Sequence, residues 1–339
     1  MTLDPDRRAR LRVVKARTLV ADHLSVDPSS LETAPFAGGA AVRGPDRLWA
    51  LVDEIAGLGS ALALAGRDSS PLSIMADRPE PGSIDVPGVV ARRAAQFTDP
   101  IEVWQVDDRD LTVARPAPVT DRALPSAAAL GLIGMLEEAG VDVTIEHGAI
   151  RGELRGLEIA RIVDTDDGAR IEVGVGRHDR EAFTMVHGGL PTADALRSVI
   201  ASVDAVRRAD AEAHPLRRLA PEGWLRSMVL GRPGLVGAAT LVSAEPPFPR
   251  DSVKDTAAAI AVGSGPDGRP VVVACSVGID LDLVPTAADA RVAHDPTARL
   301  VLVVPARDAH PVTLRLATRL RDPATVVTVG DDWRRELSP

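Results

Sequence analysis

The amino-acid sequence predicts an α/β protein built from two or three related strand–helix–strand units around mixed sheets, with a helical insertion near residues 191–235. Two observations lead to this fold class. Short runs of apolar and β-branched residues alternate with stretches whose apolar residues recur every three to four positions, as strands joined by helices do. In addition, parts of the chain resemble other parts, which is typical of proteins assembled from repeated units.

The composition is that of a globular protein with a substantial core. The chain has 339 residues, enough for two domains, and 45% of them are hydrophobic. Only 2% are aromatic and none is tyrosine, so no row of rings is available for stacking bases. The formal net charge of −9 argues against a protein that coats duplex nucleic acid, but it leaves room for a local basic face.

The single cysteine, the charged N-terminal segment and the short apolar runs indicate the cellular compartment. Cys275 alone cannot form an intramolecular disulfide or a cysteine-rich zinc site, and its apolar neighbours at 271–277 predict a buried thiol. The charged N-terminal segment lacks the apolar stretch of a secretory signal. The longest apolar runs are far too short to span a bilayer. We therefore expect a cytoplasmic protein without a membrane partner.

The first part of the chain predicts an N-terminal helix and linker at 1–35 and a first α/β unit at 36–120. In this unit the apolar spacing predicts a helix that starts at Gly44-Pro45-Asp46. Its buried face would consist of Leu48, Leu51, Val52, Ile55 and Leu58. A strand, a helix, a strand and a hairpin strand are expected to follow at 71–76, 89–97, 101–106 and 111–113.

Residues 121–245 predict a second α/β unit, which carries the helical insertion at 191–235. A helix over 126–139 ends at Gly140, a residue that favours the C-cap position. The expected strands are 141–145, 154–163 and 170–175, and the expected helices are 180–187, 192–206 and one from Pro221 onwards.

Residues 246–339 predict a third α/β unit. Its expected elements are strands at 271–283, 300–304 and 325–329 and a helix at 311–320.

Two weak internal sequence similarities, here called the first and second echo, connect these units. Residues 169–179 resemble 298–308, and residues 91–100 resemble 314–323, both without a gap. After the second echo, two pairs of valines also match, Val103 with Val326 and Val106 with Val329. Alanine, arginine and valine are so abundant that chance produces such matches too, and the sequence leaves open whether a unit was duplicated.

Two glutamates of the second unit are the candidate catalytic and metal-binding residues. Glu158 and Glu172 lie in consecutive predicted strands, so their carboxylates are placed to meet at one edge of a sheet. Divalent cations such as Mg²⁺ prefer these oxygen ligands, and a bound cation can activate water for attack on a phosphodiester. The alternative is that both glutamates face solvent on half-exposed strands.

Over about 50 residues this pattern resembles the PD-(D/E)xK nuclease superfamily. In that family a sheet carboxylate precedes a strand with an acidic-x-Lys motif, and a helix and a strand complete the core. Glu158 matches the first acid and Glu172 the second, while Gly174 stands where the family has its lysine. The resemblance therefore implies either a nuclease in which an arginine replaces that lysine or a scaffold that has lost its chemistry.

Three other residues are candidates for metal binding or catalysis. His178 directly follows a predicted strand and is placed to orient a substrate or a base, or to cap a loop. Asp280 and Asp282 stand two apart, so on the predicted strand 271–283 they share one face, which suits a cation. The next predicted strand carries no acid, and this favours a structural role for the pair.

The sequence contains no convincing site for a nucleotide cofactor. Residues 263–268 have the letters of a dinucleotide-binding glycine motif, but a strand follows where that site requires a helix, so they predict a turn. The seven histidines lack zinc-site spacing, and no Gly-x-Ser-x-Gly motif occurs. We expect neither a nicotinamide nor a flavin nucleotide, and Mg²⁺ is the only cofactor suggested.

The densest basic stretch is the candidate nucleic-acid contact. Its members are arginines between positions 207 and 232, namely Arg207, Arg208, Arg217, Arg218, Arg226 and Arg232. We select Arg207, Arg208, Arg217 and Arg218 as candidate phosphate ligands. Acidic residues interrupt the stretch, so salt bridges on a solvated helix face are the alternative.

Two functions of different classes remain. The first is a non-catalytic binding module on a degenerate nuclease-like scaffold, with an unidentified protein or nucleic acid as partner. The second is a Mg²⁺-dependent nuclease or phosphodiesterase that uses Glu158 and Glu172. The missing lysine, the acid-free third unit and the net charge of −9 favour the binding module.

Overall fold

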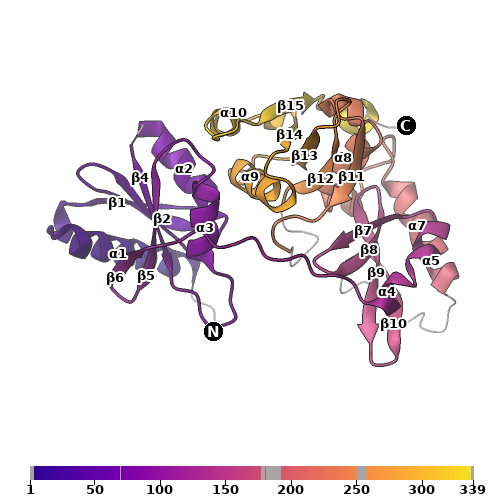
Figure 1. Ribbon diagram of the computed structural model, residues 1–339, viewed down its shortest axis with the longest axis horizontal. Coiled ribbons are helices and arrows are strands. Elements are labelled where there is room, and N and C mark those ends of the chain that lie inside the picture. Colours follow the sequence, from indigo (N-terminus) through magenta and orange to yellow (C-terminus); the bar gives the residue numbers. More distant parts are fainter. Residues whose placement is uncertain (1–3, 69, 177–179, 181–191, 250–256, 337–339) are drawn as a thin grey trace. The chain divides into compact units, whose positions relative to one another are not determined.

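The computed structural model describes residues 4–68, 70–176, 180, 192–249 and 257–336 (Figure 1). The chain forms two compact units, each made of several segments. Unit 1 comprises residues 1–119, 281–289 and 310–324, and unit 2 comprises residues 120–280, 290–309 and 325–339. The described residues form helices and three sheets, of six, four and five strands, so the predicted α/β class is confirmed.

The sheet of unit 1 begins as an antiparallel meander and continues as a parallel sheet. Its strands follow chain order, as β1 (Glu32–Phe36), β2 (Gly39–Arg43), β3 (Leu48–Val52), β4 (Leu72–Asp77), β5 (Ile101–Asp107) and β6 (Asp110–Val113). The pairs β1–β2, β2–β3 and β5–β6 are antiparallel, and β3–β4 and β4–β5 are parallel. Helices α2 (Gly57–Asp68) and α3 (Val86–Ala94) provide the crossovers that parallel strands require.

The predicted helix from Gly44 is wrong. Residues 48–52 form β3, which is buried along its whole length, and α2 starts only at Gly57. A fully buried strand is apolar without alternation, so its side chains also satisfy the spacing of a buried helix face. The predicted N-terminal helix is confirmed as α1 (Pro5–Leu24), whereas the expected linker contains β1. Helix α1 buries Ala16, Leu19 and Val20 against the sheet.

Unit 2 contains an antiparallel sheet of four strands. Its strands pair in the order β7 (Asp142–Glu146), β8 (Ala149–Leu154), β9 (Leu157–Thr165) and β10 (Gly168–Val173). The helix expected over 126–139 is divided into α4 (Ala127–Leu130) and α5 (Ile133–Glu138), while α7 (Thr192–Val206) has the predicted bounds. Leu136 and Leu196 bring α5 and α7 onto the apolar face of this sheet. Apart from Arg180, the helix predicted at 180–187 lies outside the described residues.

The second sheet of unit 2 has the same succession of pairings as β1–β5. Its strands are β11 (Thr240–Ala244), β12 (Ala259–Ser264), β13 (Pro270–Cys275), β14 (Arg299–Pro305) and β15 (Thr325–Val329). The first three pair antiparallel and the last three parallel. Helices α9 (Leu283–His294) and α10 (Pro311–Thr318) connect the parallel strands. Helix α8 (Pro221–Leu230) covers the sheet with Trp224 and Leu225.

The turn predicted at residues 263–268 is confirmed, because it joins β12 to β13. Cys275, at the end of β13, is buried as predicted, and burial raises the pKa of its thiol to about 12. The strand expected over 271–283 ends at this cysteine. The short remaining helices are η1 (Pro28–Ser30), η2 (Pro215–Arg218), η3 (Pro233–Val236), η4 (Ala306–Asp308) and α11 (Trp333–Glu336).

The two sequence echoes fall on different kinds of elements. The second echo relates α3 and β5 to α10 and β15, in each case a helix followed by the last parallel strand. The first echo relates β10, in an antiparallel sheet, to β14, which pairs parallel on both sides. Duplication of a unit stays a prediction.

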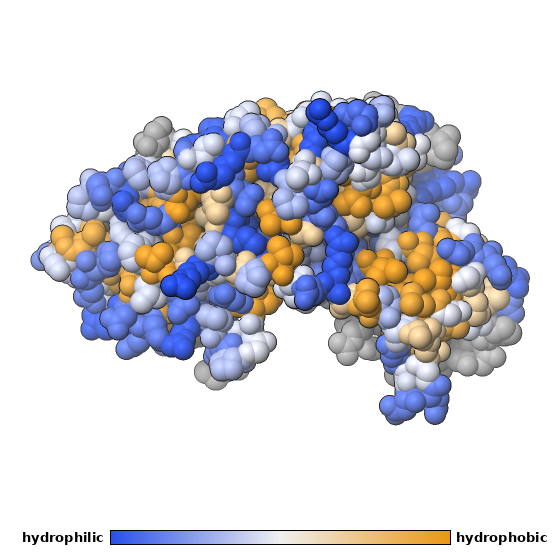
Figure 2. Space-filling model, in the orientation of Figure 1, coloured by the Kyte–Doolittle hydropathy of each residue, from blue (hydrophilic) through white to orange (hydrophobic). Residues whose placement is uncertain are grey.

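Apolar side chains gather on part of the visible surface of unit 2, in the region of β7 and β8, and are more scattered over unit 1 (Figures 1 and 2). Large exposed apolar residues of unit 2 include Leu124, Leu130, Met135 and Ile145. Within the described part of the chain, no helix combines the length and apolar character needed to cross a bilayer.

Two glycines allow α8 to approach the turn between β8 and β9. Gly156 has φ +69°, and a Cβ atom placed on it would lie 2.0 Å from the carbonyl carbon and oxygen of Gly223, in the first turn of α8. A side chain at Gly156 therefore has no room unless the helix moves. This contact holds α8 close to the sheet and, with it, the residues that α8 contributes to the sites below.

We expect Gly156→Ala to lower the free energy of unfolding by roughly 3 kcal/mol, because the clash with α8 adds to the strain of a left-handed alanine. Urea denaturation followed by circular dichroism measures this loss. Gly268→Ala is the matched control, since Gly268 has φ +78° and nothing within 4 Å of a built Cβ. Equal losses for the two variants would contradict the close packing of α8.

Candidate functional site

Glu158 and Glu172 lie on neighbouring strands of the antiparallel sheet. Glu158 is the second residue of β9, and Glu172 of β10 pairs with Arg161 of β9. Their neighbours Leu157, Ile159 and Val173 belong to the apolar core. Glu172 and Arg161 form a directly opposite pair on the polar face of the sheet. A register shift between β8 and β9 at Gly152/Glu153 lets Glu158, three residues before Arg161, share that face and contact Arg161.

Arginines surround Glu158, which is only 6% exposed. Nη1 of Arg180 donates a 2.7 Å hydrogen bond to Oε1 of Glu158. Nε of the same arginine lies 3.9 Å from Oε2 of Glu172. Arg161 donates to both oxygens of Glu158 at 2.9 Å, and Nε of Arg151 lies 3.5 Å from Oε2. The two glutamates therefore converge on a guanidinium group.

The network of ion pairs continues across the sheet to α8. Glu153 of β8 stands directly opposite Glu158 of β9, an unfavourable pairing of like charges. Nη2 of Arg226, on α8, donates a 2.6 Å hydrogen bond to Oε2 of Glu153, and Nη1 of Arg151 lies 2.7 Å from Oε2 of Glu146. All these side chains are buried. The arginines thus compensate carboxylates that could not otherwise remain charged away from water.

This geometry suits a structural role for Glu158 better than metal binding. A divalent cation needs accessible oxygen ligands, whereas both oxygens of Glu158 already accept charge-assisted hydrogen bonds. Burial lowers the pKa of Arg180, and the charge of Glu158 opposes that shift. Among the described residues, no three or more histidine, cysteine or acidic side chains are grouped as a metal site.

The prediction that Asp280 and Asp282 share a strand face is wrong. Strand β13 ends at Cys275, and both aspartates lie in the segment that leads into α9. Oδ2 of Asp282 accepts hydrogen bonds from Nη1 of Arg93 at 2.7 Å and from the hydroxyl of Thr286 at 2.9 Å. Asp282 is thus tied into the start of α9. His178 lies outside the described residues.

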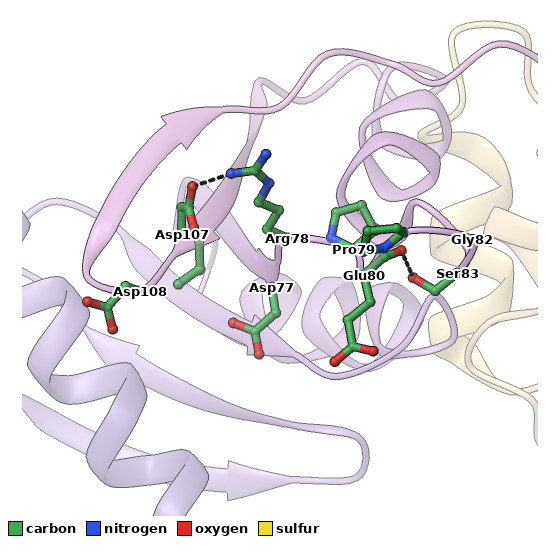
Figure 3. Close-up of a pocket in the computed structure, with 10 residues that line it drawn as sticks. Asp77, Arg78, Pro79, Glu80, Gly82, Ser83, Asp107 and Asp108 are labelled. Atoms are coloured by element: carbon green, nitrogen blue, oxygen red, sulfur yellow. Dashed lines mark hydrogen bonds and ion pairs between the residues drawn. The ribbon is translucent and has the colours of Figure 1, made fainter.

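Unit 1 has an acidic hollow at the carboxyl ends of β4 and β5, the edge at which open α/β sheets bind ligands. Its volume is about 790 Å³, and its acidic lining residues are Asp77, Glu80, Asp107 and Asp108. In Figure 3, the carboxylates of Asp77 and Glu80 point to one side of the loop, and Arg78 turns away to meet Asp107 at 2.6 Å. Asp77 is paired with Lys15 of α1.

In this region the sequence predicts only a strand at 101–106 and a hairpin strand at 111–113, and it does not identify the hollow. The available signal is an acid directly after each of two predicted strands, Asp77 and Asp107. Since Lys15 and Arg78 neutralise these two carboxylates, the hollow is not an open set of metal ligands.

Unit 2 has a basic cavity, here called the arginine cleft, between α8 and the segment that follows α7. Its volume is about 450 Å³. Trp224, Ser227, Met228 and Gly231 line it from one face of α8, since these positions are three or four residues apart. The remaining lining residues are Arg155, Arg207, Arg208, Ala209, Asp210 and Arg232.

Arg207 forms the buried wall of the arginine cleft. It is fully buried, and its guanidinium group donates to the main-chain carbonyls of Arg155, Leu216, Leu219 and Ala220. Burial, followed by the charge of Arg334, lowers the pKa of Arg207 to about 9, so it remains a cation at neutral pH. These bonds fix the chain after α7 and keep a positive charge beside the cavity.

The cleft has an accessible cationic rim. Arg208 and Arg232 are exposed, and Nε of Arg208 lies 4.0 Å from Asp204. Nη2 of Arg155, from the turn between β8 and β9, lies 2.8 Å from the same aspartate. Asp210 is the one acidic residue that lines the cleft in the described part of the chain.

The sequence-selected arginines are only partly brought together. Arg207 and Arg208 line the cleft, whereas Arg218 is exposed outside it. Arg217 is fastened to main-chain carbonyls, including that of Ala209 at 3.3 Å, and lies 5.9 Å from the ring centre of Trp224. Sequence reasoning missed Arg155, because it is far from the basic stretch along the chain and only the turn after β8 brings it close.

Fold and cavity together define an α/β protein with an arginine-lined cleft. Comparison of the chain with family models, with curated proteins and with solved structures finds no match.

We expect Glu158→Gln to lower the free energy of unfolding by about 3 kcal/mol, because it leaves buried guanidinium groups without their counter-charge. Chemical denaturation at pH 7 measures the change. Glu32→Gln is the control, since the side chain of Glu32 is 85% exposed, and its effect should stay within about 0.5 kcal/mol. A Glu158→Gln variant as stable as this control would show that the network contributes little to folding.

Proposed function

We propose that this chain is a non-catalytic binding protein whose arginine cleft takes up phosphate groups of a single-stranded nucleic acid. The observation that carries the proposal is the lining of the cleft, in which four arginines face a single acidic residue among the described residues. The overall charge of −9 makes such a concentration of cations notable. Guanidinium groups present paired donors that match phosphate oxygens.

The arrangement of the cleft favours recognition of the backbone over recognition of bases. Arg208 and Arg232 are exposed at the rim, where a phosphate can reach them. The ring of Trp224 is buried and already contacts Arg207 and Arg334, whose guanidinium carbons lie 4.7 Å and 5.0 Å from the ring centre. It therefore does not offer a free face for base stacking, and phosphate contacts carry no sequence information.

The nuclease alternative receives less support. Its proposed first ligand, Glu158, is enclosed by Arg151, Arg161 and Arg180. Arginine stays protonated in proteins, so Arg180 cannot accept a proton from water as a general base. A non-catalytic role agrees with both features.

Fluorescence anisotropy with a labelled single-stranded oligonucleotide tests the proposal. We expect Arg208→Ala and Arg232→Ala each to raise the Kd by roughly tenfold at low salt, because each removes a charged hydrogen-bond donor. Each should also reduce the slope of log K against log [salt] by about 0.7. Arg269→Ala is the matched control, since that arginine is 84% exposed and lies away from the cleft in the β12–β13 turn.

The same titration, run with Mg²⁺ and gel analysis, separates the two functions. Binding that is insensitive to both cleft variants would overturn the proposal. Cleavage that requires Mg²⁺ and disappears in Glu172→Gln, whose side chain is 25% exposed, while this variant keeps the circular dichroism spectrum of the unmodified protein, would instead establish the nuclease alternative.

A further inference from the structure

We propose that unit 1 binds a small organic carboxylate in a cavity between α2 and α10, with Arg315 as the partner of its charge. This site is independent of the arginine cleft, which belongs to unit 2. It rests on a cavity, on two buried nitrogens of Arg315 that have no hydrogen-bond partner among the described residues, and on a comparison with a second arginine of the same unit.

The cavity has an apolar lining and a volume of about 200 Å³. Its apolar walls come from α2, from the beginnings of β4 and β5 and from α10, and include Leu62, Leu72, Ile101 and Leu316. Asp99 and Arg319, which form an ion pair, also line it. The cavity therefore suits a compact apolar group next to a charge.

Arg315 lies beside this cavity, and two of its hydrogen-bond donors have no acceptor among the described residues. Its Nε and Nη2 atoms are buried, and among the described residues they have no hydrogen-bond partner. Gly66 both lines the cavity and lies against this guanidinium group, because a Cβ atom placed on Gly66 would be 2.9 Å from Nη2 of Arg315. Buried donors on a charged group are unfavourable when they are left unmet.

Arg92 shows what such an arginine binds when its partner is present. The second sequence echo matches Arg92 of α3 with Arg315 of α10. Nε of Arg92 donates to Oδ1 of Asp289 at 2.7 Å, and Nη2 donates to Oδ2 at 3.1 Å. These are the two nitrogens that have no partner in Arg315. Asp289, on α9, is fully buried.

Reciprocal backbone bonds relate the two echo segments within unit 1. The amide of Thr98 donates to the carbonyl of Arg319 at 2.9 Å, and the amide of Arg321 donates to the carbonyl of Gln96 at 2.8 Å. When residues 91–100 are aligned with residues 314–323, each of these two hydrogen bonds corresponds to the other. Phe97 and Leu320, which match in the same alignment, form an isolated β-bridge with each other. Contacts of this kind are what a two-fold relationship produces.

Arg315 therefore lies against α2 in the way that Arg92 lies against α9. The difference is that α9 provides Asp289 as the partner of Arg92, whereas α2 provides only Gly66 and the cavity beside Arg315. A ligand carboxylate between Nε and Nη2 of Arg315 would make the bidentate pair that Arg92 already has. The charged residues that line the cavity, Arg319 and Asp99, form an ion pair with each other, so Arg315 beside Gly66 is the cation available to a ligand. The ligand class is accordingly a monocarboxylate with a compact apolar body.

Isothermal titration calorimetry of the full chain with benzoate tests this site. We expect saturable binding, and a Kd about tenfold higher for benzyl alcohol, which has the same ring without the charge. Arg315→Gln should raise the Kd for benzoate by at least about tenfold, whereas Arg10→Gln, on the exposed side of α1, should leave it unchanged. Equal affinity of Arg315→Gln and the unmodified protein for benzoate, or the absence of saturable binding, would overturn the proposal.

A second pair of variants tests the same site even if Arg315→Gln fails to fold. Gly66→Asp places a carboxylate on α2 beside Arg315, so it should raise the Tm above that of Gly66→Asn and abolish benzoate binding. A Gly66→Asp variant that melts no higher than Gly66→Asn and still binds benzoate would show that Arg315 does not require an anion.

Discussion

The pairing of buried guanidinium groups is the constraint on which the rest of this structure depends. The chain has only two lysines, Lys15 and Lys254, so arginine supplies nearly every cation. A guanidinium group can be buried only where several acceptors meet its planar set of donors. Arg226 meets this requirement at the contact between α8 and the antiparallel sheet, and Arg92 at the contact between α3 and α9. Each pairing fixes how a helix is rotated and where along its length it packs.

The same constraint distinguishes structural arginines from those available to a ligand. Arg207 is saturated by main-chain carbonyls, so it builds the arginine cleft and contributes charge without being free to move. Arg208 and Arg232 are exposed at the rim of the same cleft. Arg315 is different from both, because its Nε and Nη2 atoms are buried yet have no hydrogen-bond partner among the described residues. The count of satisfied donors, rather than the number of arginines in a stretch, separates these roles.

The elements that the sequence predicted best are those with one clear periodicity. Helix α7 has an unbroken stripe of apolar residues, and β15 is a short β-branched run, and both have the predicted bounds. Residues 48–52 were misassigned because a strand that is buried throughout does not alternate. Asp280 and Asp282 were placed on a strand because the apolar run extends towards them, but Gly278, with φ +89°, belongs to the loop that follows β13.

The candidate site was less predictable than the fold because its partners are distant along the chain. The sequence singles out Glu158 as an acid at a sheet edge or facing solvent, not as a buried one, and nothing in its spacing associates Glu158 with Arg180 or Arg151. Arg155 reaches the arginine cleft only because Gly156 permits α8 to pack against its turn. Short motifs therefore indicated which residue types could do chemistry, whereas the hydrogen-bond partners decided whether they were free to do it.

The informative positions of the second echo are those at which the surroundings of residues 91–100 and 314–323 differ. Phe97 and Leu320 preserve an apolar contact, and the backbone bonds beside them are reciprocal. Arg92 and Arg315 stand at matching positions, and Arg92 donates to Asp289, whereas Nε and Nη2 of Arg315 have no hydrogen-bond partner among the described residues. Buried donors without an acceptor among the described residues are unfavourable for folding, since burial removes the water that would otherwise accept from them. A ligand carboxylate in the adjacent cavity would supply the oxygens that Nε and Nη2 of Arg315 lack, so a binding role accounts for this arginine better than a contribution to stability does.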